Sequence, residues 1–515
     1  MNTKIIARNS FWMVLDSVLG ILSALVTSIA IARVIGPEKL GYFNYVIWLS
    51  SISGTISSYG LALVLRKYLA EFQGRHDLEK SRALLAICFR AFSLIAAVLV
   101  CAGLVLVFTL VPPEHQLYSA LAVISLLPSV LMSLPSAANA AVEDMAPNVW
   151  ASLVSTPINL VGVALALTRD WGLVGLTGTF LVSRTIDFAV RYALFRVRFP
   201  SEILVRFTQA FSMGTIPKLP AEVQAQIKRF LLQTTMLRIL DAVVWDRSEL
   251  FFLKQYSEIH QLAFYSLSFN SLQQALLLPQ IFVSATSLTM MVQQGRDPKN
   301  VAPMTATTIR YVALLALPIT LGIAALSTPL VTLLYGDQYL PVIPVLTIVA
   351  LFSIPVALVL PIKQMLIATN QQGFLLKWGC VAGIINIALD LWWIPDHGAI
   401  GAAMGNGVAQ LVASVGLYVF AVWKANVPSP GQGLLKTLVS AGVMALIVAG
   451  LAQKAPPALA IAAGVPIGVL VFLLMVRWTR NFEAGDLQRL MGLRHQLPPW
   501  LRNAYSTTIQ MVVLS

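Results

Sequence analysis

Charged side chains inside apolar runs are the residues of this sequence whose chemistry is most informative. Arg184 and Asp187 share one such run, and Arg238 and Asp241 share another, three positions apart in each case. Residues at this spacing lie on one face of a helix. Arginine binds anionic oxygens through its planar fork, so Arg184 and Arg238 are candidates to bind an anion. The alternative is that each arginine forms an ion pair with the aspartate of its own run, which neutralises both charges.

A longer polar stripe extends from Arg238 toward the end of the same run. Its spacing of three and four residues is typical of one face of a continuous helix. Its members are Arg238, Asp241, Trp245, Ser248 and Glu249. We expect this face to look into a cavity, with Arg238, Asp241 and Trp245 among the residues that bind substrate.

Asp16 is a lone carboxylate in the first apolar run. A carboxylate in apolar surroundings can take up a proton or a cation when access to water changes. Asp16 is therefore our candidate for ion coupling to a proton or to sodium. A hydrogen bond to a nearby serine or asparagine is the alternative.

The elements that carry these residues are predicted to be membrane-spanning helices. Hydrophobic residues make up 57% of the 515 residues and charged residues only 11%, whereas about 25% charged is usual in soluble proteins. A helix needs roughly 20 apolar residues to cross the hydrocarbon core. The fourteen predicted spans are 11–34, 41–65, 83–110, 117–141, 149–168, 172–194, 230–253, 261–292, 305–333, 342–368, 374–394, 398–422, 433–451 and 458–477. Prolines interrupt 117–141 and 342–368, which is tolerated where neighbouring helices satisfy the freed carbonyls.

The distribution of lysine and arginine predicts the orientation of these spans. Basic residues gather before the first span, after the second, between residues 191 and 229 and after residue 477, while the alternate connections carry few. Because cytoplasmic loops retain lysine and arginine, we expect both termini in the cytoplasm. The positions of the charged residues within the oriented spans predict their depth in the membrane. Arg184 and Arg238 lie near mid-membrane, and Arg90 lies at the cytoplasmic mouth, where we expect it to contact substrate. Glu249 and Asp390 lie closer to the exported side.

The remaining composition excludes other classes of protein. A net charge of +13 is compatible with nucleic-acid binding, but the basic residues border apolar spans, where topology and anionic lipids account for them. The three cysteines show no metal-ligand spacing. We therefore expect no nucleic acid, no metal and no cofactor.

An internal duplication is the second organising feature. Glycines in WGLVGLTG and HGAIGAAMG place Gly172 and Gly398 at an offset of 226, and Asn159 and Asn386 precede them at an offset of 227. Near-constant offsets predict two lobes of six helices each. Recurrence of small residues at helix contacts would explain each glycine pair but not the shared offset.

This duplication predicts the domain organisation. The expected parts are an N-lobe at 1–195, a cytoplasmic linker at 196–229, a C-lobe at 230–425, two further spans at 426–478 and a cytoplasmic amphipathic tail at 479–515.

Several segments resemble one family. ARVIGPEKLGYFNY at 32–45, WDRSELFFLKQYSEIHQLAFYSLSF at 245–269 and TLLYGDQYLPVIPVL at 332–346 are similar to segments of bacterial oligosaccharide flippases. LIATNQQ at 366–372 and the pattern from Asp486 to Pro498 add to the resemblance. These flippases are the Wzx-type polysaccharide transporters of the multidrug/oligosaccharidyl-lipid/polysaccharide exporter superfamily.

The resemblance implies an activity and its partners. The family flips a polyprenyl-pyrophosphate-linked oligosaccharide across the inner membrane for cell-surface polysaccharides such as the O-antigen of lipopolysaccharide. For such a substrate we expect Arg184 and Arg238, the basic residues nearest mid-membrane, to clamp the pyrophosphate and Asn270 to contact sugar hydroxyls, although Asn270 could equally form an interhelical hydrogen bond. The expected partners are this lipid-linked substrate and membrane lipids, and we expect a monomer.

Two other classes stay open. A proton- or cation-coupled multidrug antiporter of the same fold would need only twelve spans. A membrane enzyme such as an oligosaccharide polymerase would need catalytic residues in a long exported loop, and the predicted exported loops are short. We therefore expect a transporter without enzymatic activity.

Overall fold

Every regular element in the described residues is a helix, which confirms the predicted all-α membrane fold. The computed structural model describes residues 3–199, 219–244, 247–482 and 486. The chain divides into two compact units, Met1–Ser248 and Glu249–Ser515. Each unit has its own apolar clusters of buried residues.

The first unit is built from one very long helix and several shorter ones. Its described helices are α1 (Thr3–Gly74), α2 (Leu78–Leu110), α3 (Pro113–Ile124), α4 (Leu126–Leu131), α5 (Ser133–Ala141), α6 (Ala146–Thr168), α7 (Gly172–Arg198) and α9 (Ala221–Val244).

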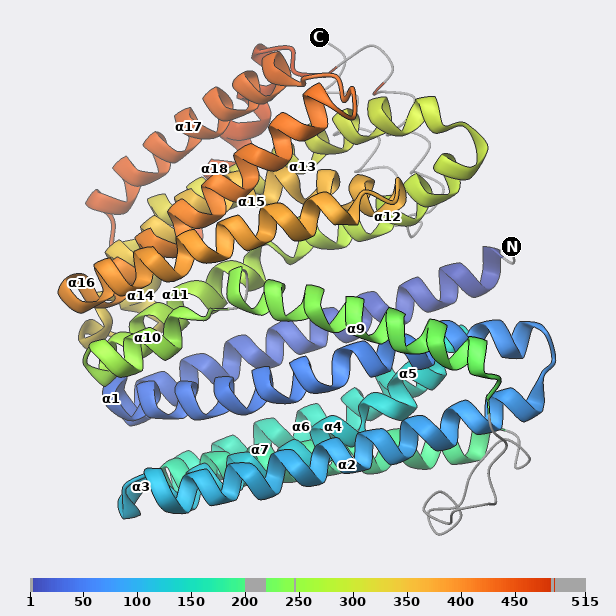
Figure 1. Cartoon of the computed structure of the whole chain (residues 1–515). Helices are drawn as coiled ribbons and strands as arrows, with labels where there is room; N and C mark the ends of the chain where they lie inside the picture. The colour runs from blue at the N-terminus through green and yellow to red at the C-terminus, as the bar shows by residue number, and fades with distance from the viewer. Residues whose placement is uncertain (1–2, 200–218, 245–246, 483–485, 487–515) are drawn as a thin grey trace. The chain divides into compact units, whose positions relative to one another are not determined.

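A break at Gly36 divides α1 into two arms. Gly36 has φ 75° and ψ 170°, outside the helical region, and Pro37 follows it. Positive φ is accessible to glycine without steric cost, and proline at the start of a helix loses no hydrogen bond. The two arms coincide with the first two predicted spans. Figure 1 shows them in blue, running back along each other with α9 beside them.

Two prolines divide the predicted span 117–141 into α3, α4 and α5. Proline has no N–H to bond the carbonyl four residues earlier, which weakens the helix there. α3 ends at Ile124, four residues before Pro128, and α4 ends at Leu131, four residues before Pro135. The prolines therefore account for the places where this span is interrupted.

The second unit contains the remaining helices. In the described residues they are α10 (Glu249–Tyr256), α11 (Ile259–Ala275), α12 (Leu277–Arg296), α13 (Val301–Ala325), α14 (Ser327–Leu334), α15 (Val342–Ala368), α16 (Gln372–Trp423), α17 (Gly431–Lys454) and α18 (Pro457–Trp478), with short 3-10 turns at Pro298–Asn300 and Asp337–Tyr339.

The two glycines that the sequence pairs share an unusual backbone conformation. Gly172, which begins α7, has φ 58°, and Gly398, which divides α16 into two arms, has φ 52°. A side chain at Gly398 would also approach Gln261 to 2.9 Å. The shared conformation is consistent with the predicted duplication, because both glycines start the last helix of their predicted lobe.

The number of spans agrees with the prediction only in part. Ten helices are long and apolar enough to cross a membrane, or eleven when the bent pair α11–α12 is one span. Two of them, α1 and α16, are broken at a glycine and cover two predicted spans each. Among the described helices, the predicted span 230–253 does not meet this test, so the count of fourteen stays a prediction.

The prediction that 230–253 forms one continuous helix is wrong. α9 ends at Val244, α10 begins at Glu249, and Arg247 between them has φ 59°. The face predicted to run from Arg238 to Glu249 therefore does not exist as one helical stripe. α9 belongs to the first unit and begins at Ala221, ahead of the predicted lobe boundary at 230. Residues 200–218 of the predicted linker and most of the predicted tail lie outside the described residues.

A buried ion pair joins the end of the second unit to α13. Asp486 is fully buried, and Arg310 of α13 donates to its Oδ2 at 2.5 Å while the Tyr311 hydroxyl donates to its Oδ1 at 2.7 Å. Asn481 also donates to the hydroxyl of Thr437 on α17 at 2.6 Å. Asn481 and Asp486, which follow α18, are therefore each anchored to another helix of this unit.

We expect Asp486→Ala to lower the free energy of unfolding by about 3–5 kcal/mol, because the substitution removes one partner of a buried pair. Thermal unfolding of the purified protein in detergent measures this loss. Asp337→Ala, at an exposed aspartate, is the control and should change stability by no more than about 0.5 kcal/mol. Equal effects of the two substitutions would contradict the anchoring role.

Candidate functional site: a hydroxyl-lined cavity and a buried acidic cluster

A polar cavity of about 310 Å³ lies within the first unit. Its wall comes from the second arm of α1, from the interrupted segment α3–α5 and from α7. Hydroxyl side chains dominate this wall, and they are Ser50, Ser51, Thr55, Ser58, Tyr59, Ser125, Ser129 and Ser133. The volume is at the small end of the range for ligand pockets, enough for one compact group rather than a whole oligosaccharide.

The sequence explains why this wall is polar. Ser50, Gly54, Ser58 and Ala62 recur every four residues on α1, which puts small side chains on one face of the helix. The break before α4 contributes one more hydroxyl, because Ser125 lies between α3 and α4. A helix face of small residues leaves open space where a face of leucines would fill it.

Hydroxyls of this wall are arranged to accept hydrogen bonds. Thr55 donates to the Ser51 carbonyl at 2.8 Å, Ser58 to Gly54 at 2.8 Å and Ser125 to Ala122 at 2.6 Å. A hydroxyl has one donor, so a hydroxyl that donates to its own helix keeps only acceptor lone pairs for a ligand. These three positions therefore suit a ligand that carries donors, such as a sugar hydroxyl.

Arg184 supplies the positive charge of the cavity. It lines the wall from α7, and its guanidinium lies 4.9 Å from the centre of the Phe180 ring, one turn earlier. Among the described residues Arg184 forms no ion pair and no hydrogen bond with another side chain. Its fork is available for an anion.

Arg238 lies beside the same wall. Its guanidinium is 5.8 Å from the centre of the Tyr59 ring, within the range of a cation–π contact, and Tyr59 lines the cavity. The packing of α9 against α1 brings the two arginines chosen from the sequence to one region of the first unit.

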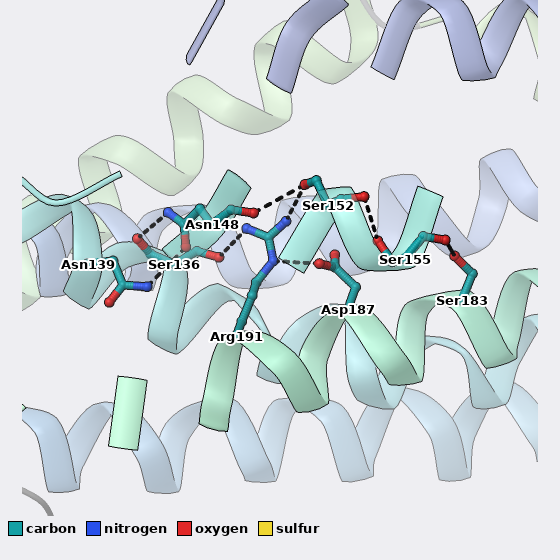
Figure 2. A network of polar contacts seen from close by, with 8 residues as sticks. All are labelled: Ser136, Asn139, Asn148, Ser152, Ser155, Ser183, Asp187 and Arg191. Carbon is teal, nitrogen blue, oxygen red and sulfur yellow. Dashed lines mark hydrogen bonds and ion pairs between the residues drawn. The ribbon is translucent and has the colours of Figure 1, made fainter. Parts of the chain in front are cut away.

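The ion pair between Arg184 and Asp187, which was the predicted alternative, does not form in the structure. Asp187 accepts from Arg191 Nε at 2.8 Å, one turn further along α7. Figure 2 shows Arg191 held between helices, since its two terminal nitrogens also donate to Ser136 at 3.2 Å and to Ser152 at 3.1 Å. Asp187 and Arg191 are both largely buried, with side chains 7% and 14% exposed.

The other residues chosen from the sequence do not gather at the cavity. Arg90 is half-buried on α2, Asp16 is half-buried on the first arm of α1, and Asp241 is exposed on α9. Asn270 is half-buried on α11 and belongs to the second unit. Trp245 lies outside the described residues. Their predicted roles stay predictions.

A second polar site, which the sequence did not predict as a cluster, lies inside the second unit. Glu249, the first residue of α10, is completely buried. Its carboxylate accepts from the Tyr265 hydroxyl at 2.9 Å, from Asn386 Nδ2 at 3.0 Å and from Asn406 Nδ2 at 2.6 Å. Helices α10, α11 and both arms of α16 therefore meet at one carboxylate.

Asp390 adds a second carboxylate to this cluster. It is fully buried, and its Oδ2 accepts from the same Asn386 amide at 3.2 Å. Its Oδ1 is buried without a hydrogen-bond partner in the described part of the chain. No described lysine, arginine or histidine forms an ion pair with either carboxylate. Two buried carboxylates without a cation are costly, so the cluster favours uptake of a proton or a metal cation.

The sequence contained a signal for this cluster. The predicted duplication singled out Asn386, and Asp390 follows one helical turn later on the same face. The sequence placed Glu249 on the polar stripe of Arg238 rather than beside Asn386 and Asp390, because it did not predict the break between α9 and α10.

Two units of membrane-spanning helices, each with a buried polar site, define the class of a multi-pass membrane transporter. Residues 6–293 match the family described as Polysaccharide biosynthesis protein, and the chain belongs to this family. The predicted resemblance to Wzx-type polysaccharide transporters is thereby confirmed. The chain is a multi-pass protein of the bacterial inner membrane.

Individual relatives agree with this assignment. The succinoglycan biosynthesis transport protein ExoT of Rhizobium meliloti (strain 1021) is 23% identical over 523 residues, which cover 97% of each chain. The solved structure of a lipid II flippase, MurJ, in an inward closed conformation has a TM-score of 0.69 at 16% identity and covers 91% of this chain and 97% of that one. An inward-facing multidrug resistance MATE transporter of the MOP superfamily has a TM-score of 0.65 at 14% identity and covers 79% and 94%. Both solved structures therefore share the fold of this chain.

We expect Asp390→Asn to raise the melting temperature in sodium-free buffer, because it removes one uncompensated buried charge without changing the shape of the side chain. Asn386→Asp is the matched opposite change, adds a carboxylate to the cluster and should lower the melting temperature. Thermal unfolding of purified protein in detergent measures both. A melting temperature for Asp390→Asn below that of the unsubstituted protein would show that the cluster is not strained by its charge.

Proposed function

We propose that this protein is a flippase that translocates a polyprenyl-pyrophosphate-linked oligosaccharide across the inner membrane for cell-surface polysaccharide synthesis. The family and the relative that transports in succinoglycan biosynthesis support a substrate of this class. The observation that carries the proposal is the cavity of the first unit, which combines acceptor hydroxyls with the arginine fork of Arg184. A glycan joined to pyrophosphate carries the complementary groups, hydroxyl donors and a compact anion.

Each part of this site has a proposed role. Arg184 binds a phosphate oxygen, and Arg238 beside Tyr59 assists at the edge of the cavity. The cavity holds the pyrophosphate and the first sugar, while the remainder of the glycan and the polyprenyl chain lie outside it. The two units rock in alternating access, with both termini in the cytoplasm.

The acidic cluster of the second unit supplies the proposed coupling. Glu249 and Asp390 take up a proton or a sodium ion, which relieves the cost of two buried carboxylates. A ligand that binds one conformation better than another shifts the population toward it, so cation binding here biases the transport cycle. This assignment replaces Asp16 as our candidate for coupling, because the described part of the chain gives Asp16 no such cluster.

A cation-coupled multidrug antiporter is the alternative function. The similarity of the fold to a MATE transporter and the acidic cluster are compatible with it. The cavity argues against it, since a wall of hydroxyls and one arginine suits an anionic, hydroxylated ligand better than an apolar cation.

We expect Arg184→Ala to reduce export at least about tenfold, because a charged hydrogen bond to phosphate contributes about 1.5–3 kcal/mol. Arg184→Lys should rescue export only in part, since lysine keeps the charge but loses the planar fork. The assay is complementation of a flippase-deficient strain, with surface polysaccharide and protein level both quantified. Arg169→Ala, at an exposed arginine, is the matched control. Normal export by Arg184→Ala at normal protein level would exclude the proposed phosphate contact.

The coupling proposal has a separate test. Export by the unsubstituted protein should stop when the proton or the sodium gradient is collapsed selectively. Sodium chloride, compared with choline chloride, should raise the melting temperature of the purified protein if sodium is the ion, because a ligand that binds only the folded state stabilises it. Glu249→Gln should abolish the gradient dependence. Export that is indifferent to both gradients would contradict coupling through this cluster.

A further inference from the structure

Three charged residues of α7 share one face and carry a net charge of +1. Arg184, Asp187 and Arg191 are spaced three and four residues apart, so Asp187 lies between two arginines, either of which it can pair with by spacing. The charge of whichever arginine pairs with Asp187 is compensated by the carboxylate. The other arginine carries the net positive charge of the face.

In the structure the pair does not line the cavity. Asp187 accepts from Arg191 Nε at 2.8 Å, whereas Arg184 lies over Phe180 and lines the cavity wall. Arg191 is fixed in this arrangement from outside α7, by Ser136 of α5 and Ser152 of α6. Figure 2 shows Ser152 continuing into a chain of contacts with Asn148 and Ser155. Three helices therefore hold the guanidinium of Arg191 against Asp187.

We propose that Arg191 is a positioning residue for the anion site: by pairing with Asp187, it keeps Asp187 from pairing with Arg184 and so leaves the charge of Arg184 in the cavity. This inference rests on the proposed function only in taking Arg184 as the residue that binds the anion. Without Arg191, Asp187 is a buried carboxylate that lacks its partner, and the next cation on its face is Arg184, three residues earlier. Pairing there removes the positive charge from the cavity.

The local potential of the cavity is the quantity to measure. Thr55 is exposed and lines the cavity, so Thr55→Cys places a thiol in it. Cys88, Cys101 and Cys380 are replaced by alanine, which leaves this thiol alone. The purified protein reacts with anionic sulfonatoethyl methanethiosulfonate and, in parallel, with the cationic trimethylammonioethyl reagent. A change in the accessibility of the thiol affects both rates alike, so it does not change their ratio. The ratio therefore reports the sign of the charge near the thiol.

The expected results form a double-mutant cycle. Arg184→Met lowers the anion-to-cation ratio several-fold. Arg191→Met lowers it by a similar factor in the presence of Asp187, but changes it by less than about twofold when Asp187→Asn is also present. Export follows the same order, lost with Arg191→Met and recovered in the double variant. Arg191→Gln, which keeps hydrogen-bonding capacity toward Ser136 and Ser152, repeats the cycle with less disturbance of packing.

Arg198→Met is the control for long-range electrostatics. Arg198 is on the same helix and pairs with Asp144, so its loss removes an equal charge without involving Asp187. It should leave the ratio within about twofold of the starting value. Equal effects of Arg191→Met with and without Asp187 would overturn the inference, because Arg191 would then act only through its own charge.

The same data distinguish failure of the inference from failure of the proposed function. An unchanged ratio and normal export in Arg184→Met would remove Arg184 from the anion site and the inference with it. Loss of export in Arg184→Met, together with no dependence of Arg191 on Asp187, would overturn the positioning role and leave the proposed function standing.

Discussion

The absence of water from the hydrocarbon core is the constraint on which this structure depends. Every polar group in a span must find a partner inside the protein, since an unsatisfied one costs several kcal/mol. Hydroxyls meet the constraint locally: Ser58 and Ser125 donate to carbonyls of their own helices. Buried charges meet it by pairing, as Arg191 does with Asp187 and Arg310 with Asp486. The positions at which the constraint is not fully met are therefore informative.

Two positions at which a charge is not compensated by an ion pair lie in the candidate sites, one in each unit. Arg184 faces a cavity without an anionic partner, and the Glu249–Asp390 cluster is buried without a cationic one. Their signs are opposite, which suits an anionic substrate in the first unit and a coupling cation in the second. In the pairs Arg191–Asp187 and Arg310–Asp486 each charge is compensated by its partner, which separates these scaffold contacts from the two candidate sites.

The sequence predicted most of the helices because spans depend on hydropathy, a local property that needs no knowledge of packing. Prolines also predicted the interruption of 117–141, whereas the interruption predicted for 342–368 is wrong, because α15 continues through Pro355 and Pro361. The break between α9 and α10 was missed, since no proline or glycine marks it and Arg247 adopts positive φ instead. Pair spacing could not decide whether Asp187 pairs with Arg184 or Arg191. That choice depends on Ser136 and Ser152, which come from other helices.

The break at Arg247 also separates the helices that carry residues of the two candidate sites. Glu249, which organises the acidic cluster, is the first residue of α10, and Val244 is the last residue of α9. α9 packs on α1 within the first unit and carries Arg238, whose guanidinium lies over Tyr59 of the cavity wall. A chain segment of four residues, 245–248, therefore joins the helix beside the cavity to the carboxylate of the cluster. Because Arg247 interrupts the seventh predicted span, no single helix carries both Arg238 of the proposed substrate site and Glu249 of the proposed coupling site.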